Sequence, residues 1–221
     1  MTHSDNKTTQ TNAHAVILLA AGLSQRLGTP KQLLQQQGLP LITQMVQTAW
    51  ASAPQHVIVV VPKALPDVAR AAKCADIPSE CLHIVTNDSS HLGMAHSLQL
   101  GIESVRTHAA TCQRVLIMGV DQIHIDSAHL CALLGSASEL AVSRYWADEY
   151  QTTRVLGLPV VVSGALLSVW SSQLAGDQGL RHLIRADNQD KAVIDNDDLM
   201  LDIDTPEQLA KASTAGWIDV R

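Results

Sequence analysis

The chain has few aromatic residues and no excess of positive charge. It contains no phenylalanine, and aromatic residues make up 3% of its 221 residues. Its 15 lysines and arginines are outnumbered by 21 aspartates and glutamates, which gives a formal net charge of −6 at pH 7. Proteins that bind nucleic acid rely on a basic surface, and single-strand binders add aromatic stacking platforms. We therefore expect no nucleic-acid partner.

Paired cysteines and metal-binding histidine motifs are also missing. Cys74, Cys81, Cys112 and Cys131 form no C-x-x-C pair, and the ten histidines include no H-E-x-x-H. Free thiols are therefore expected rather than disulfides or a zinc site. No apolar run approaches the roughly 18 residues that cross a bilayer, so we expect no membrane partner.

The N-terminal segment is polar and lacks an apolar signal region. Residues 1–13 are rich in Thr, Asn and Gln and show no periodicity, which predicts a disordered leader. We expect residues 14–221 to form one domain, since this length suits a single core, and we expect the protein to be cytoplasmic.

Apolar runs alternate with amphipathic segments along the chain. Runs such as AVILL (15–19) and RVLIM (114–118) are typical of strands buried on both faces. Strand–helix alternation predicts a single-domain α/β fold with a mostly parallel sheet flanked by helices, and ligands bind beyond the carboxyl ends of such strands.

The interval 144–157 is polar with interspersed aromatics and predicts an inserted hairpin or lid. The expected strands are 15–19, 56–61, 81–85, 114–118, 141–143, 159–162 and 192–194, and the expected helices 41–53, 65–74, 94–105, 127–134, 165–174, 179–186 and 206–212.

The strand 15–19 is followed by a loop of small residues. Residues 20–22, Ala-Ala-Gly, would let a ligand approach the backbone N–H groups. Ser24, Arg26 and Lys31 then add a hydroxyl, a forked guanidinium and an ammonium point charge, which together suit a polyphosphate. The alternative is an ordinary surface loop whose cations are only solvated.

Two common phosphate-binding motifs do not fit this loop. The P-loop needs its lysine directly after the second glycine, whereas Thr29 and Pro30 separate Gly28 from Lys31. The dinucleotide motif G-x-G-x-x-G fails because Gly22 has no glycine two positions later.

The loop instead matches a longer signature at every specified position. It resembles L-A-A-G-x-S-x-R-x-G-x-x-K of the MobA-like nucleotidyltransferases, and the similarity extends over about residues 15–212. The resemblance implies a Rossmann-like nucleotidyltransferase fold, catalytic roles for Arg26 and Lys31 beside the leaving pyrophosphate, and nucleotide binding by Leu19, Ala20, Ala21, Gly22 and Ser24.

Acidic residues lie next to two of the expected elements. Asp121 lies just past strand 114–118, and Asp202 and Asp204 precede a Thr-Pro helix start in MLDIDTPEQL. Taken alone, each acid is more often an N-cap or a solvated turn residue. Mg²⁺, however, is usually held by one or two carboxylates plus substrate phosphate.

These acids also resemble the two metal positions of the family, D-Q-P and D-x-D-T-P-E-D. Ile123 stands in place of the proline, and Gln208 in place of the last acid. The resemblance implies that Asp121 is catalytic and that Mg²⁺ is bound by Asp121 and Asp202, with Asp204 as the neighbouring candidate.

Two further segments resemble family motifs. HLGMAHSL (91–98) is similar to G-M-x-x-S-L, which implies that Gly93, Met94 and Ser97 contact the base and ribose. GDQGLRHL (176–183) is similar to the G-D-x-G-A-R of the molybdenum cofactor cytidylyltransferase branch, and GLP (157–159) to its G-x-P. Without the resemblance, 176–183 is a helix start capped by an aspartate. The acceptor-binding residues that this branch implies are Pro159, Asp177, Gly179 and Arg181.

The resemblance implies Mg²⁺-dependent transfer of a nucleoside monophosphate from an NTP to a phosphorylated acceptor. Ala21 stands where the guanylyltransferase branch has glycine, and its methyl narrows the space beside the base, so we expect CTP. The expected acceptor is the molybdenum cofactor, molybdopterin, with a molybdoenzyme as a further partner. Two alternatives stay open: an accessory factor that binds a nucleotide or cofactor without turnover, and a sugar-phosphate nucleotidyltransferase.

Overall fold

The computed structural model describes residues 13–147, 150–174, 180–186, 190–200 and 202–219. The leader predicted for residues 1–13 therefore lies almost wholly outside the described residues, as do Asp177 and Gly179. Among the described residues, no helix has the length and apolar character needed to cross a bilayer.

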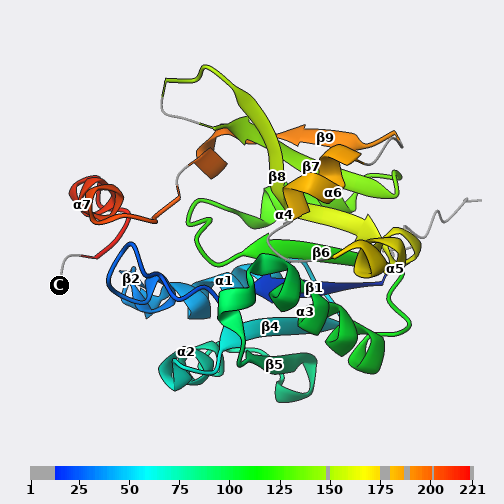
Figure 1. Ribbon diagram of the computed structural model, residues 1–221, viewed down its shortest axis with the longest axis horizontal. Helices are drawn as coiled ribbons and strands as arrows, with labels where there is room; N and C mark the ends of the chain where they lie inside the picture. Colours follow the sequence, from blue (N-terminus) through cyan, green and yellow to red (C-terminus); the bar gives the residue numbers. More distant parts are fainter. Residues whose placement is uncertain (1–12, 148–149, 175–179, 187–189, 201, 220–221) are drawn as a thin grey trace, which may run out of the picture.

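A seven-stranded sheet forms the centre of the fold, with helices on both faces (Figure 1). The strand order is β5-β4-β1-β6-β8-β7-β9. Only β8 runs antiparallel to its neighbours within this sheet, which confirms the mostly parallel α/β fold. The strands are β1 (His14–Leu19), β4 (His56–Pro62), β5 (Leu82–Asn87), β6 (Arg114–Gly119), β7 (Leu140–Trp146), β8 (Arg154–Ser163) and β9 (Ala192–Asp195).

Two apolar layers enclose the sheet because the side chains of each strand alternate between its faces. In β1, Ile17 faces the layer that includes α3, α5 and α6, while Val16 and Leu18 face the layer that includes α1, α2 and α4. All three of these side chains are fully buried. The helices are α1 (Leu41–Trp50), α2 (Pro66–Ala72), α3 (Met94–His108), α4 (Ser127–Leu134), α5 (Gly164–Gln173), α6 (Leu180–Ala186) and α7 (Pro206–Thr214).

A third, smaller core attaches the C-terminal segment to the loop after β1. Leu27 and Leu34 from that loop pack with Ile203, which precedes α7, and with Ala212, which belongs to α7. Beside this core, β2 (Gln35–Gln36) and β3 (Leu39–Pro40) form a two-stranded ribbon that the sequence did not predict. The packing brings residues 202–204 next to the loop although they are far apart in sequence.

The hairpin predicted for 144–157 is present, but it is not a separate insertion. Most of it consists of β7 and β8, which extend well beyond their predicted ranges and pair from Leu140↔Val162 to Trp146↔Arg154. Arg144 and Arg154 both form ion pairs with Asp195 of β9, which ties the hairpin to the sheet edge.

Candidate active site

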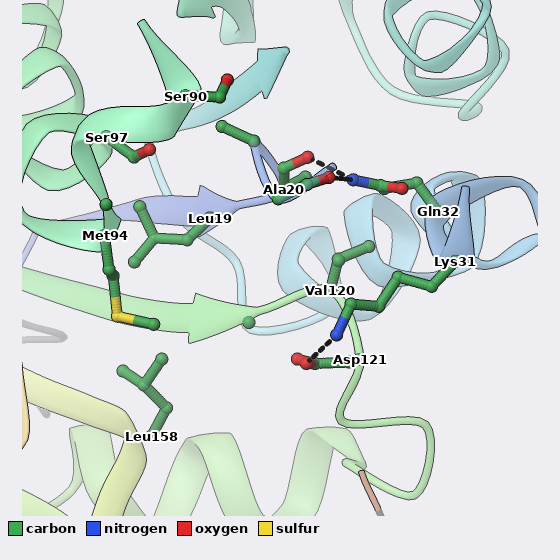
Figure 2. Close-up of a pocket in the computed structure, with 14 residues that line it drawn as sticks. Leu19, Ala20, Lys31, Gln32, Ser90, Met94, Ser97, Val120, Asp121 and Leu158 are labelled. Atoms are coloured by element: carbon green, nitrogen blue, oxygen red, sulfur yellow. Dashed lines mark hydrogen bonds and ion pairs between the residues drawn. The ribbon is translucent and has the colours of Figure 1, made fainter. Parts of the chain in front are cut away.

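A cavity of about 290 Å³ opens at the carboxyl ends of β1 and β6 (Figure 2). Its walls come from the loop after β1, the start of α3, the end of β6, and Leu158 of β8. We call it the first cavity. The predicted residues that line it are Leu19, Ala20, Ala21, Gly22, Lys31, Gly93, Met94, Ser97 and Asp121.

A second cavity of about 470 Å³ adjoins the first. The residues that line it include Tyr145, Leu180, Arg181, His182, Asp202 and Asp204. Met94, Asp121 and Leu158 line both cavities. The two cavities are therefore adjacent, and Asp121 lies at their junction.

Lys31 lies at the centre of an ion-pair network at this junction. Its Nζ is 2.8 Å from Asp121 Oδ2 and 2.6 Å from Asp204 Oδ1, and its side chain is only 12% exposed. Burial alone would lower the pKa of Lys31, but the two carboxylates outweigh it and raise the pKa above its usual value. Arg26 Nη2 donates to the other oxygen of Asp204 at 2.7 Å.

The charge on Asp204 is stabilised by this network, whereas that on Asp202 is opposed. Burial would raise the pKa of Asp204, but the bonds from Lys31 and Arg26 hold it below its usual value. For Asp202, burial and the nearby carboxylates of Asp121 and Asp204 raise the pKa to about 7. Among the described residues, Asp202 has no ion-pair partner.

The loop before Asp121 is shaped by a close approach. A Cβ on Gly119 would lie 2.8 Å from Asp121 Oδ1, so a larger residue would displace the carboxylate. The buried side chain of Gln122 accepts a bond from Gly119 N at 3.3 Å and donates to Leu158 O at 2.6 Å. Gln122 therefore fixes Leu158 on the wall between the two cavities.

Tyr145 connects the hairpin to the second cavity. It is 6% exposed, and its hydroxyl is 3.4 Å from Arg181 Nη2. Burial raises the pKa of Tyr145, so the phenol stays protonated near neutral pH. Gly157 lies against this ring, and any Cβ there would collide with the phenol oxygen. The absence of a side chain at Gly157 therefore allows Tyr145 to reach Arg181.

The carboxylates offer hard oxygen donors of the kind that Mg²⁺ or Mn²⁺ prefers. The raised pKa of Asp202 reflects burial first and then crowding of like charges, and a divalent cation would relieve this crowding. Within the described residues, however, no group of three His, Cys, Asp or Glu side chains is arranged to hold an ion by itself. A metal here would need further oxygen ligands, such as substrate phosphates.

Some predicted site residues lie outside the two cavities. Ser24 shapes the loop, because its Oγ accepts a bond from Lys31 N at 3.1 Å. Arg26 is bound to Asp204 with 73% of its side chain exposed. Pro159 is buried, and its carbonyl accepts a bond from Ser143 Oγ.

Several lining residues were not predicted as site residues. They include Gln32, Gln122, Leu158, Tyr145 and His182. Four of these five neighbour predicted residues: Gln32 follows Lys31, Gln122 follows Asp121, His182 follows Arg181, and Leu158 precedes Pro159. The sequence could have suggested these four by adjacency, whereas Tyr145 falls in the predicted insertion.

A protein-family model matches most of the chain. The sequence model of the MobA-like NTP transferase domain matches residues 16–192, a range that ends before Asp202 and Asp204. Among curated proteins, no sequence matches the chain.

Solved structures provide the spatial comparison. A homologue of Mycobacterium tuberculosis Rv0371c from Mycobacterium sp. strain JC1 is 25% identical, with a TM-score of 0.73 over 92% of this chain and 96% of that chain. The manganese complex of Rv0371c from M. tuberculosis H37Rv is 21% identical, with a TM-score of 0.68 over 90% of this chain and 97% of that one. The inositol-1-phosphate CTP transferase from T. maritima is 16% identical, with a TM-score of 0.69 over 93% and 95%. The two more distant structures support the fold alone.

Proposed function

Because the chain belongs to the MobA-like NTP transferase family, we propose that it transfers CMP from CTP to a phosphate-bearing acceptor and releases pyrophosphate. The observation that carries this proposal is that the two cavities are adjacent and share Asp121. Nucleotidyl transfer requires two phosphorylated substrates to meet at one atom, and the cavities meet at Asp121.

The nucleotide is assigned to the first cavity. The N–H groups of Ala21 and Gly22 have no acceptor among the described residues, and a Cβ on Gly22 would meet nothing within 4 Å, so the loop has room for phosphates. The hydroxyls of Ser90 and Ser97 supply polar contacts on the opposite wall for the nucleoside.

The acceptor is assigned to the second cavity. Arg181 offers a forked donor for an acceptor phosphate, and the protonated hydroxyl of Tyr145 holds this guanidinium in place. The wall of Leu158 separates acceptor from nucleotide except at the junction, where an acceptor oxygen would approach the α-phosphorus.

In the reaction, an acceptor phosphate oxygen forms a bond to the α-phosphorus of CTP. The bond from that phosphorus to the oxygen leading to the β-phosphate breaks in line, and its electron pair leaves with pyrophosphate. No covalent enzyme intermediate is needed. Catalysis is therefore mainly positioning and charge neutralisation. Lys31 and Arg26 would carry the charge that develops on pyrophosphate, after exchanging Asp204 for phosphate oxygens.

Asp121 and Asp202 would hold the Mg²⁺ ion that we propose for this site. Asp204 already has two cationic partners, whereas Asp202 has none among the described residues, which favours Asp202 as the second ligand. The bound ion would neutralise charge on the phosphates. The manganese complex of Rv0371c supports a divalent cation here.

The preference for CTP rests on the methyl of Ala21, which is 5% exposed and lines the first cavity. One methyl in a pocket discriminates by about 1–3 kcal/mol, or roughly 10–200-fold. The CTP transferase from T. maritima supports this choice at the level of the fold. Molybdopterin is our proposed acceptor, from the likeness of residues 176–183 to the cytidylyltransferase branch, and a molybdoenzyme would then receive the product.

The test is pyrophosphate release with CTP, GTP, ATP and UTP, each combined with molybdopterin, sugar phosphates and inositol phosphate in Mg²⁺. We expect release with CTP and molybdopterin at least about tenfold faster than with any other pair. Preference for GTP would refute the base assignment, and a sugar phosphate as best acceptor would refute the acceptor. If the protein binds CTP but releases no pyrophosphate with any pair, it is a binding factor and not an enzyme.

A further inference from the structure

Gln32 is a fully buried polar side chain that the reaction described above does not use. It belongs to the short 3-10 helix Lys31–Leu33 and is 0% exposed. Its Nε2 donates to two backbone carbonyls of the loop after β1, Ala20 O and Gly22 O, each at 2.7 Å (Figure 2). Because both neighbours are acceptors, the amide nitrogen and not the oxygen must face them.

The other end of this amide is unsatisfied. Oε1 of Gln32 is buried and has no hydrogen-bond partner among the described residues. A buried acceptor without a donor opposes folding, whereas the two bonds from Nε2 satisfy carbonyls that an apolar side chain would leave without this donor. Those two bonds therefore account for an amide at this position.

Those two bonds determine how the loop presents its donors. In a trans peptide unit the C=O and the following N–H point in opposite directions. With the carbonyls of Ala20 and Gly22 held toward Gln32, the N–H groups of Ala21 and Leu23 point away from it. In Figure 2, the Gln32 amide approaches Ala20 from the side opposite Met94. In the described part of the chain, neither of these N–H groups has a hydrogen-bond acceptor.

The same short helix also holds the far end of the loop. Lys31 N donates to Ser24 Oγ at 3.1 Å, while the Lys31 ammonium contacts Asp121 at 2.8 Å. Helix 31–33 therefore joins the small-residue loop, through Gln32, to the cation at the junction of the two cavities.

We propose that Gln32 is a positioning residue for the triphosphate: it orients the peptide units of residues 20–23 so that their N–H groups bind phosphate oxygens of the nucleotide. This inference rests on the proposed function, since it assigns the phosphate part of the nucleotide to this loop. Gln32 itself contacts no phosphate; it acts through the backbone that it holds.

The test compares CTP, CDP and CMP binding by calorimetry in Mg²⁺ for the wild type, Gln32→Met and Gln44→Met. Gln44 is the matched control, because its amide also donates to a backbone carbonyl, that of Gln36, and it lines neither cavity. We expect Gln32→Met to lower the ratio of CTP affinity to CMP affinity at least tenfold, while its affinity for CMP stays within twofold of wild type. Gln44→Met should keep the wild-type ratio.

A second measurement uses the wild-type protein and does not depend on the variant folding. In amide NMR spectra, the signals of Ala21 and Leu23 should shift downfield on addition of CTP but not CMP. Unchanged signals, or a CTP-to-CMP affinity ratio that Gln32→Met leaves intact, would overturn the role of Gln32. If the wild type binds CTP and CDP no more tightly than CMP, the proposed function is overturned, and this inference with it.

Discussion

Lys31 offers the sharpest test of the site, because one ammonium holds two carboxylates from distant segments. Lys31→Met keeps the aliphatic stem and removes the bonds to Asp121 and Asp204. A hydrogen bond to a charged group contributes about 1.5–3 kcal/mol. Arg26 still pairs with Asp204, and both carboxylates are about a third exposed, so solvent and Arg26 recover part of the loss. We expect the free energy of unfolding to fall by about 2–3 kcal/mol.

The pH dependence of this difference follows from the two pKa shifts. The raised pKa of Lys31 contributes stability that is present below its unfolded pKa and lost as pH rises through its folded value. The lowered pKa of Asp204 contributes stability that is present above its unfolded pKa and lost as pH falls through its folded value. The stability gap between wild type and Lys31→Met should therefore shrink in strong acid. It should widen as pH rises through about 7, because Lys31 opposes the rise in the pKa of Asp202, which lies at about 7.

Catalysis should suffer more than stability. Removing one preorganised donor from developing charge costs about 10²–10³ in kcat. Urea unfolding at pH 7 and pyrophosphate release would measure the two effects separately. Lys63→Met is the control, since Lys63 is exposed and has no ion pair within the described residues. If Lys31→Met matches this control in both assays, the ammonium serves neither the carboxylates nor the phosphates.

Three further changes test other parts of the structure. Asp121→Asn should lower kcat at least about 100-fold, because the carboxylate no longer stabilises charge in the site. The melting temperature should change little, because the Asp121 side chain is partly exposed; near-normal Mg²⁺-dependent turnover would contradict its role. Gly157→Ala should displace Tyr145 from Arg181 and raise the KM for acceptor while nucleotide binding persists, and equal changes for both substrates would argue against an acceptor site there. Burial lowers the pKa of His14 from 6.5 to about 4, so wild-type stability should fall by about 3 kcal/mol as pH drops from 6.5 to 4. Urea titrations of His14→Gln should show a weaker fall, and an identical pH profile would disprove the assignment.

The sheet and the loop after β1 were predictable because their signals are local. A run such as AVILL cannot be solvated on either face, and the small residues that follow it leave few alternatives to a loop. Asp121 was equally accessible to prediction, since the residue after a central parallel strand lies at the carboxyl edge of the sheet.

The remaining parts of the site depend on contacts that sequence periodicity does not encode. Tyr145 lies among polar residues, and its burial follows from the space left by Gly157 on the paired strand. Gln32 is a polar residue that the pattern would place at the surface, yet it is buried and donates to two carbonyls of the preceding loop. The sequence also displays Lys31 and Asp204 as charges without showing that they pair.

The pairing of Lys31 with Asp204 has a consequence for biosynthesis. It joins residues 173 positions apart in sequence, so it is among the contacts of longest sequence separation in the described part of the chain. Contacts of such long separation form late, because the closure entropy of the intervening loop must be overcome first. A nascent chain that has emerged from the ribosome only as far as β9 can complete its sheet without the carboxylates of residues 202–204. Substrate affinity should therefore arise after the core has folded, as the last event of maturation.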